Sequence, residues 1–152
     1  MVNILFVERS DNVLTKDRLM RFGVVTDGTS YLCGEQSESH MHWFFDCPFS
    51  KAVVLMLQNW LIIKLQGNVE DWIIKWRRKS LLQKKVVMAV IFGLVYGIWD
   101  CRNTCRVELF VPQPKRLIEG IHSVLKVRLN RMEFSRGKIK CCRWLQQTGL
   151  SE

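Results

Sequence analysis

The 152-residue chain lacks the sequence motifs that mark common catalytic centres. It has no paired aspartates of the kind with which a polymerase holds two metal ions. It has no Gly-x-Ser-x-Gly nucleophile turn and no glycine-rich loop for binding phosphate. Internal repeats and low-complexity tracts are also missing. These absences exclude the enzyme classes that depend on such motifs, and we expect that the protein is not an enzyme.

The beginning of the chain lacks the basic start and long apolar run of a secretory signal. We therefore expect a nuclear or cytoplasmic protein that is not secreted. Its six cysteines should then be free or metal-bound thiols. The most apolar run, residues 86–99, is shorter than the roughly 20 residues that span a bilayer. We expect a buried helix there and no membrane partner.

The whole chain has 23 Lys and Arg and 14 Asp and Glu, which gives a net charge of +9. Acidic residues are scarce in two parts of it. Residues 75–85 contain six bases and no acid, and residues 115–143 contain nine bases and two acids. This pattern favours a nucleic-acid partner, RNA or single-stranded DNA of low specificity, although a solvated basic helix face has the same pattern. The candidate contacts are Lys75, Arg77, Arg78, Lys79, Lys84, Lys85, Lys126, Arg128 and Arg131.

Apolar spacing and turn residues predict a mostly α protein. The expected helices cover residues 16–22, 48–65, 69–76, 80–106 and 115–132. We expect a single helical domain over residues 15–132, with a small zinc-knuckle-like loop near its N-terminal end. An N-terminal arm (1–14) and a basic, frayed C-terminal tail (133–152) flank it.

The helix over residues 80–106 is predicted to form the centre of the core, because it is apolar nearly all round from Val86 to Trp99. Gly93 and Gly97 would let another helix approach it closely. Its expected buried residues are Leu82, Val86, Ala89, Val90, Phe92 and Trp99. The stripes expected on the flanking helices are Ala52, Leu55, Met56, Asn59, Trp60 and Ile63, and Ile118, Ile121, Leu125, Leu129 and Met132. Trp144 has polar neighbours in the sequence and is a candidate for stacking on nucleotides.

Residues 30–50 concentrate the side chains that bind metals. Cys33 precedes Gly34, which suits a tight turn, and His42 stands five residues before Cys47. Thiolate and imidazole are ligands that zinc prefers, in a tetrahedron of four. We therefore predict zinc as a cofactor, held by these three residues with His40 or Ser30 as a possible fourth ligand. The alternative is a site without metal, in which the cysteines pack as small apolar side chains.

Four short blocks of the sequence carry a resemblance to a known family. They are Thr15 to Gly23, Tyr31 to Gly34, Glu38 to Ser50 and Ile98 to Asn103. In this order they resemble the reverse-transcriptase zinc-binding domain of plant LINE-type (non-LTR) retrotransposons, over roughly Thr15 to Asn130. The chain departs from the family at Ser30, where the family has the first cysteine of a C-x-x-C knuckle.

The resemblance implies a retrotransposon-derived, zinc-binding and nucleic-acid-associated accessory module that lacks the polymerase. Such a module would hold template or transcript during reverse transcription. Two alternatives stay open. One is a helical protein-interaction module in which the loop is only a staple, and the other is a non-functional relic with a degraded zinc site.

Overall fold

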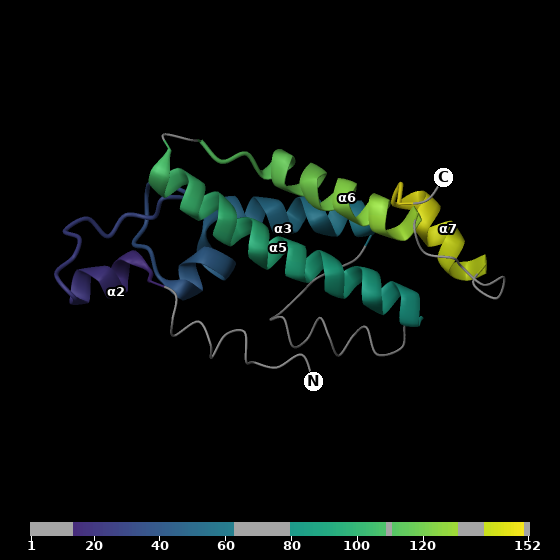
Figure 1. Cartoon of the computed structure of the whole chain (residues 1–152), viewed down its shortest axis with the longest axis horizontal. Helices are drawn as coiled ribbons and strands as arrows, with labels where there is room; N and C mark the ends of the chain where they lie inside the picture. The colour runs from purple at the N-terminus through teal and green to yellow at the C-terminus, as the bar shows by residue number, and fades with distance from the viewer. Residues whose placement is uncertain (1–13, 63–79, 109–110, 131–138, 151–152) are drawn as a thin grey trace. The chain divides into compact units, whose positions relative to one another are not determined.

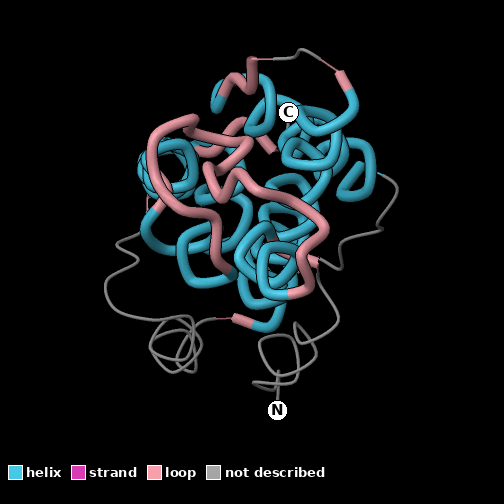
Figure 2. The backbone as a smooth tube through the Cα atoms, turned by 90° about the vertical axis from the view of Figure 1, so that its left-hand side faces the viewer, coloured by secondary structure: helices cyan, strands magenta, loops and turns pink. Residues whose placement is uncertain are grey.

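The computed structural model describes residues 14–62, 80–108, 111–130 and 139–150, and these are mostly helical (Figure 1). The helices are α2 (Lys16–Arg21), the π-helical turn η2 (His42–Asp46), α3 (Pro48–Leu61), α5 (Leu81–Val107), α6 (Pro114–Asn130) and α7 (Ile139–Gln147). Within the described ranges there is no strand (Figure 2), and Thr29 and Ser37 form an isolated β-bridge. The predicted mostly α fold is confirmed. The helix expected over residues 69–76 lies outside the described residues.

The chain divides into two compact units. Unit 1 consists of Met1–Lys51 and Ile98–Pro112, and unit 2 consists of Ala52–Gly97 and Gln113–Glu152. Helices α3 and α5 each contribute residues to both units. Unit 1 therefore combines the cysteine- and histidine-containing segment with the last turns of α5. The predicted division into arm, domain and tail stays a prediction.

In unit 1, the start of α2 is capped from far along the chain. Thr15 stands at the N-cap position, but its side chain makes no capping hydrogen bond. Instead, the backbone N–H of Lys16 donates to the Glu38 carboxylate at 2.9 Å. Gly23, with a positive φ of 69°, follows the helix and accommodates the left-handed turn that ends it. The cap of α2 therefore comes from a side chain 22 residues further along the chain.

In unit 2, α5 begins at a local capping box. The Ser80 hydroxyl accepts a hydrogen bond from the Gln83 N–H at 3.2 Å, and the Gln83 side chain accepts one from the Ser80 N–H at 3.2 Å. This reciprocal pair satisfies two N–H groups at the helix start. The helix thus begins within one residue of its predicted start at residue 80.

The buried face of α5 only partly agrees with the prediction. Leu82, Val86 and Val90 are buried, but Phe92 is 44% exposed and Trp99 is 41% exposed. The expectation that Phe92 and Trp99 are core residues was wrong, and Ala89 is half-buried. A helix that is apolar all round has no periodicity from which its buried face can be chosen. The packing of α5 against other elements determines which of its faces is buried.

Helices α5 and α6 lie side by side in unit 2 (Figure 1). Their contact depends on two glycines of α5. A Cβ atom added to Gly97 would lie 3.1 Å from Leu117 Cγ, and one added to Gly93 would lie 3.4 Å from Ile121 Cγ1. Helix α6 therefore packs where α5 has no side chains, as the glycine spacing predicted. On α6 the predicted stripe is confirmed, since Ile118, Ile121, Leu125 and Leu129 are all buried, while Met132 lies outside the described residues.

Helix α3 buries a face shifted from the predicted one. Its buried side chains include Val53, Leu57 and Leu61, whereas Leu55 is 59% exposed. The remaining predicted stripe residues that the structure describes, Ala52, Met56, Asn59 and Trp60, are half-buried or exposed. Apolar residues at successive positions supported either face. The chosen face follows the i, i+4 row of branched aliphatic side chains.

Helix α7 is held to α3 by a pair of tryptophans. The Trp60 indole N–H donates to the Thr148 carbonyl at 2.8 Å, and the Trp144 indole N–H donates to the Leu61 carbonyl at 3.1 Å. Each ring thus caps the C-terminal end of the other helix. The frayed tail expected here is wrong for residues 139–147. Trp144, a predicted stacking residue, is half-buried in the fold instead.

Helix α5 also bears on the predicted absence of a membrane partner. Within the described residues it is long and apolar enough to cross a bilayer, with a window of mean hydropathy 1.7 that is 39% buried. The core helix of a soluble protein meets the same criterion.

Candidate metal centre

Cys33, His42 and Cys47 converge in unit 1. Their ligand atoms all lie within 4.8 Å of one another, and Cys33 Sγ lies 3.4 Å from His42 Nε2. Cys47 is fully buried, His42 is 5% exposed and Cys33 is half-buried. The structure therefore brings together the three residues predicted as zinc ligands. Two thiols and one imidazole form a donor set that suits zinc.

A tight loop positions Cys33. The Ser30 N–H donates to the Gln36 carbonyl at 2.8 Å, and the Gly34 N–H donates back to the Ser30 carbonyl at 2.8 Å. Gly34 has a positive φ of 69°, which a residue with a Cβ rarely adopts. These bonds fold residues 30–36 into the predicted knuckle-like turn, with Cys33 near its tip.

A single π-helical turn positions the other two residues. The Cys47 N–H donates to the His42 carbonyl at 2.7 Å, so the two residues, five apart, close one turn of η2. The Ser50 hydroxyl donates to the Trp43 carbonyl and ties this turn to the first turn of α3. The spacing noted in the sequence thus places an imidazole and a thiol on one side of the turn.

The two thiols differ in acidity. Burial raises the pKa of the Cys33 thiol, but N–H groups of Gln36 and Glu35 and hydrogen bonds with Ser30 and Cys47 outweigh it, so this pKa is lowered. Burial raises the pKa of Cys47, and the Cys33 sulfur beside it raises that pKa further. Cys33 is therefore the more acidic of the two thiols.

The two candidates for a fourth ligand occupy different places. Ser30 is 1% exposed, and its hydroxyl accepts a hydrogen bond from the Leu32 N–H at 3.3 Å. It also hydrogen-bonds the Cys33 sulfur, so it lies on the loop where the missing cysteine would stand. The His40 ring instead packs edge-on against Phe44, with 5.1 Å between ring centroids. It is not part of the three-residue cluster.

Sequence reasoning missed a buried ion pair beside the cluster. Arg102 Nη2 lies 2.8 Å from Glu38 Oε1, and the two side chains are 3% and 0% exposed. The Tyr31 N–H also donates to this carboxylate, at 3.4 Å. Both charged residues stood inside blocks of the family resemblance, yet 64 residues separate them. No local sequence signal pointed to the pair, because Arg102 lies in a polar stretch of α5 between Asp100 and Arg106.

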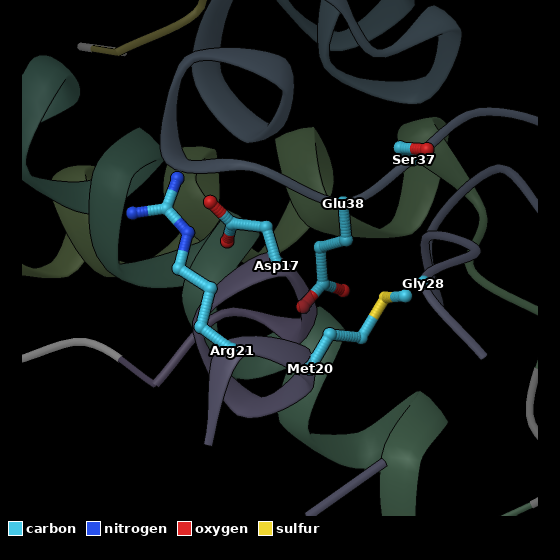
Figure 3. Close-up of a pocket in the computed structure, with 6 residues that line it drawn as sticks. All are labelled: Asp17, Met20, Arg21, Gly28, Ser37 and Glu38. Atoms are coloured by element: carbon cyan, nitrogen blue, oxygen red, sulfur yellow. The ribbon is translucent and has the colours of Figure 1, made fainter. Parts of the chain in front are cut away.

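An open pocket of about 400 Å³ lies on the α2 side of unit 1 (Figure 3). Its lining residues are Asp17, Met20, Arg21, Gly28, Ser37 and Glu38. One carboxylate oxygen of Asp17 is buried without a hydrogen-bond partner among the described residues. The pocket shares Glu38 with the ion pair but is lined by none of the three cluster residues.

The predicted nucleic-acid contacts are only partly described. Lys84 and Lys126 are half-buried, and Lys85 and Arg128 are exposed; all four lie in unit 2. The other candidates, Lys75, Arg77, Arg78, Lys79 and Arg131, lie outside the described residues. Among the unit 2 side chains that the structure describes, Glu119 is the one acid. The metal-ligand candidates and the basic residues thus belong to different units.

Cys101 and Cys105, one turn apart on α5, do not join the cluster. Both are half-buried, and burial raises the pKa of each thiol. They are therefore protonated thiols at neutral pH.

Comparison with known proteins supports the metal-site interpretation for the first third of the chain. Residues 1–53 match a family model described as zinc-binding in reverse transcriptase. All three cluster residues lie within this match, whereas Arg102 does not. No curated protein and no solved structure matches the chain.

Proposed function

We propose that this chain is a retrotransposon-derived zinc-binding module that associates with nucleic acid as an accessory to reverse transcription. The observation that carries the proposal is the convergence of Cys33, His42 and Cys47 inside the segment matched by the zinc-binding family model. The four sequence blocks favour an origin in plant LINE-type (non-LTR) elements. We further propose that the module is not itself an enzyme and acts in the nucleus or cytoplasm.

Zinc would be held by the two thiolates and His42 Nε2. The ion supplies a structural cross-link between the knuckle loop and η2. Because such a site has no counterpart in the unfolded chain, the free energy of binding adds to the free energy of folding. The lowered pKa of Cys33 favours the thiolate form that binds the metal.

Unit 2 would provide the contact with nucleic acid. Its described side chains include the bases Lys84, Lys85, Lys115, Arg116, Lys126, Arg128 and Arg143, against the single acid Glu119. The Glu119 carboxylate lies 3.8 Å from Lys115 Nζ, at the surface. Cations spread over such a surface contact phosphates and read little sequence. We therefore propose RNA or single-stranded DNA as a partner of low specificity.

Metal analysis of protein purified without added zinc tests the proposal. We expect about one zinc ion per chain, lost on Cys47→Ser, because that change removes one of three protein ligands. The matched control is Cys101→Ser, which changes a half-buried thiol of the same unit outside the cluster. Wild-type protein without zinc, whose melting temperature is unaffected by a chelator, contradicts the proposal and favours the degraded-site alternative.

A further inference from the structure

The guanidinium of Arg102 lies at the centre of a buried polar and aromatic cluster in unit 1. It pairs with Glu38 and donates to the Leu14 carbonyl at 3.3 Å. Its Cζ lies 4.8 Å from the centre of the Trp43 ring and 5.2 Å from that of Tyr31. A second cation lies over the Tyr31 ring, since Lys16 Nζ is 3.8 Å from the ring centre.

The groups around this guanidinium are chain neighbours of the metal-ligand candidates. Tyr31 stands two residues before Cys33, and Trp43 directly follows His42. Glu38 lies in the loop that joins the two ligand-bearing turns, and its carboxylate also accepts the Tyr31 N–H. One planar cation on α5 therefore contacts both halves of the segment that carries the ligands.

We infer that Arg102, through Glu38, Tyr31 and Trp43, is a positioning residue for the metal site. This inference rests on the proposed zinc binding and deepens it. Because zinc ligands must sit close to their ideal distances, a clamp that fixes two ligand-bearing turns relative to each other raises metal affinity. The clamp comes from residue 102, far outside residues 1–53 that match the family model.

Stability alone is a weak explanation for this ion pair. Burying two charges costs desolvation free energy, and well-packed apolar residues can often replace such a pair without loss. Apolar replacements, however, cannot form directional hydrogen bonds to the loop. The forked guanidinium bonds Glu38 through Nε and Nη2, at 3.4 and 2.8 Å, while its Cζ lies over the Trp43 ring. This geometry fixes the orientation of the loop as well as its position.

Arg102→Lys tests the inference, because lysine keeps the charge but loses the fork and the flat face. The measurements are the zinc dissociation constant by competition with a chromophoric chelator, and the visible absorption of the Co²⁺-substituted protein. We expect zinc binding weakened about 10- to 100-fold, as for other changes outside the ligand shell, and an altered Co²⁺ spectrum. Arg106→Lys, one turn further on the same helix and exposed, is the matched control and should bind zinc like the wild type.

Tyr31→Leu provides a second variant that keeps the ion pair and removes a half-buried ring from the clamp. We expect this variant also to bind zinc more weakly than the wild type. If circular dichroism shows that Arg102→Lys does not fold, Tyr31→Leu alone tests the inference. Folded variants with wild-type zinc affinity and Co²⁺ spectrum, even if they melt at lower temperature, overturn the inference and leave a structural ion pair. Wild-type protein that binds no zinc instead contradicts the proposed function, and the inference falls with it.

Discussion

The packing of α6 against α5 can be tested by adding a single methyl group to different glycines. Alanine is favoured over glycine inside a helix by about 1 kcal/mol, so Gly→Ala stabilises wherever the methyl group has room. Gly120, inside α6, has no atom within 4 Å of the position of an added Cβ. Gly120→Ala should therefore raise the free energy of unfolding by about 0.5–1 kcal/mol.

At Gly97 the same change meets a neighbouring side chain. The added Cβ would lie 3.1 Å from Leu117 Cγ and 3.2 Å from both of its Cδ atoms. Overpacking of this kind costs about 1–3 kcal/mol, which equals or exceeds the gain in helix propensity. We expect Gly97→Ala to range from no change to a loss of about 2 kcal/mol. Gly93→Ala, with its closest contact at 3.4 Å, should fall between the other two.

Urea unfolding followed by far-ultraviolet circular dichroism measures all three variants against the wild type. The midpoint should shift while the slope stays constant, because only native packing and helix propensity change. The expected order of stability is Gly120→Ala, then Gly93→Ala, then Gly97→Ala. If Gly97→Ala is stabilised as much as Gly120→Ala, then Leu117 does not pack against α5 at this point, and the described core of unit 2 is wrong.

Three further predictions concern the loop, its surroundings and the basic surface. Ser30→Cys should tighten zinc binding in a competition assay by providing a fourth thiolate, and an unchanged dissociation constant would show that Ser30 does not face the metal. Hydrogen bonds from Lys16 and Thr29 lower the pKa of Asp27, so its stabilising contribution is complete at neutral pH and is lost as pH falls below about 4. Asp27→Asn should flatten the acid side of the melting temperature–pH curve, and an unaltered curve would refute this. Lys126→Ala with Arg128→Ala should lower the log–log salt slope of single-stranded RNA binding by about 0.7 per lost phosphate contact, and a slope equal to that of the wild type would place the contacts elsewhere.

Most of the metal-ligand candidates could be predicted from the sequence. Cys33 and Gly34 indicated a turn, and the spacing of His42 and Cys47 indicated ligands on one side of a short element. The sequence could not predict whether Ser30 or His40 faces the cluster. The orientation of the rings at positions 40 and 44 depends on their packing against each other. Residues 40 and 44 flank His42 at equal distance in the sequence, which gave no reason to prefer one arrangement of their rings.

By itself, the sequence determined those features that depend on residues close together along the chain. Helix α5 begins where Ser80 and Gln83 cap each other, and α6 approaches it at Gly93 and Gly97, as their spacing indicated. The Ser80–Gln83 capping box and the missing side chains of the two glycines are local features, so a single stretch of chain specifies them.

Only the tertiary structure decided which surfaces are buried and which charges meet. Because residues 86–99 are apolar nearly all round, their sequence does not indicate which face of α5 is buried. The contacts of α5 with other elements select that face, and they leave Phe92 and Trp99 partly exposed. Glu38 caps α2 and pairs with Arg102 across 64 residues, a partnership that no local pattern encodes. Burial and charge pairing depend on which distant segments share the same space, and that is settled only when the chain packs.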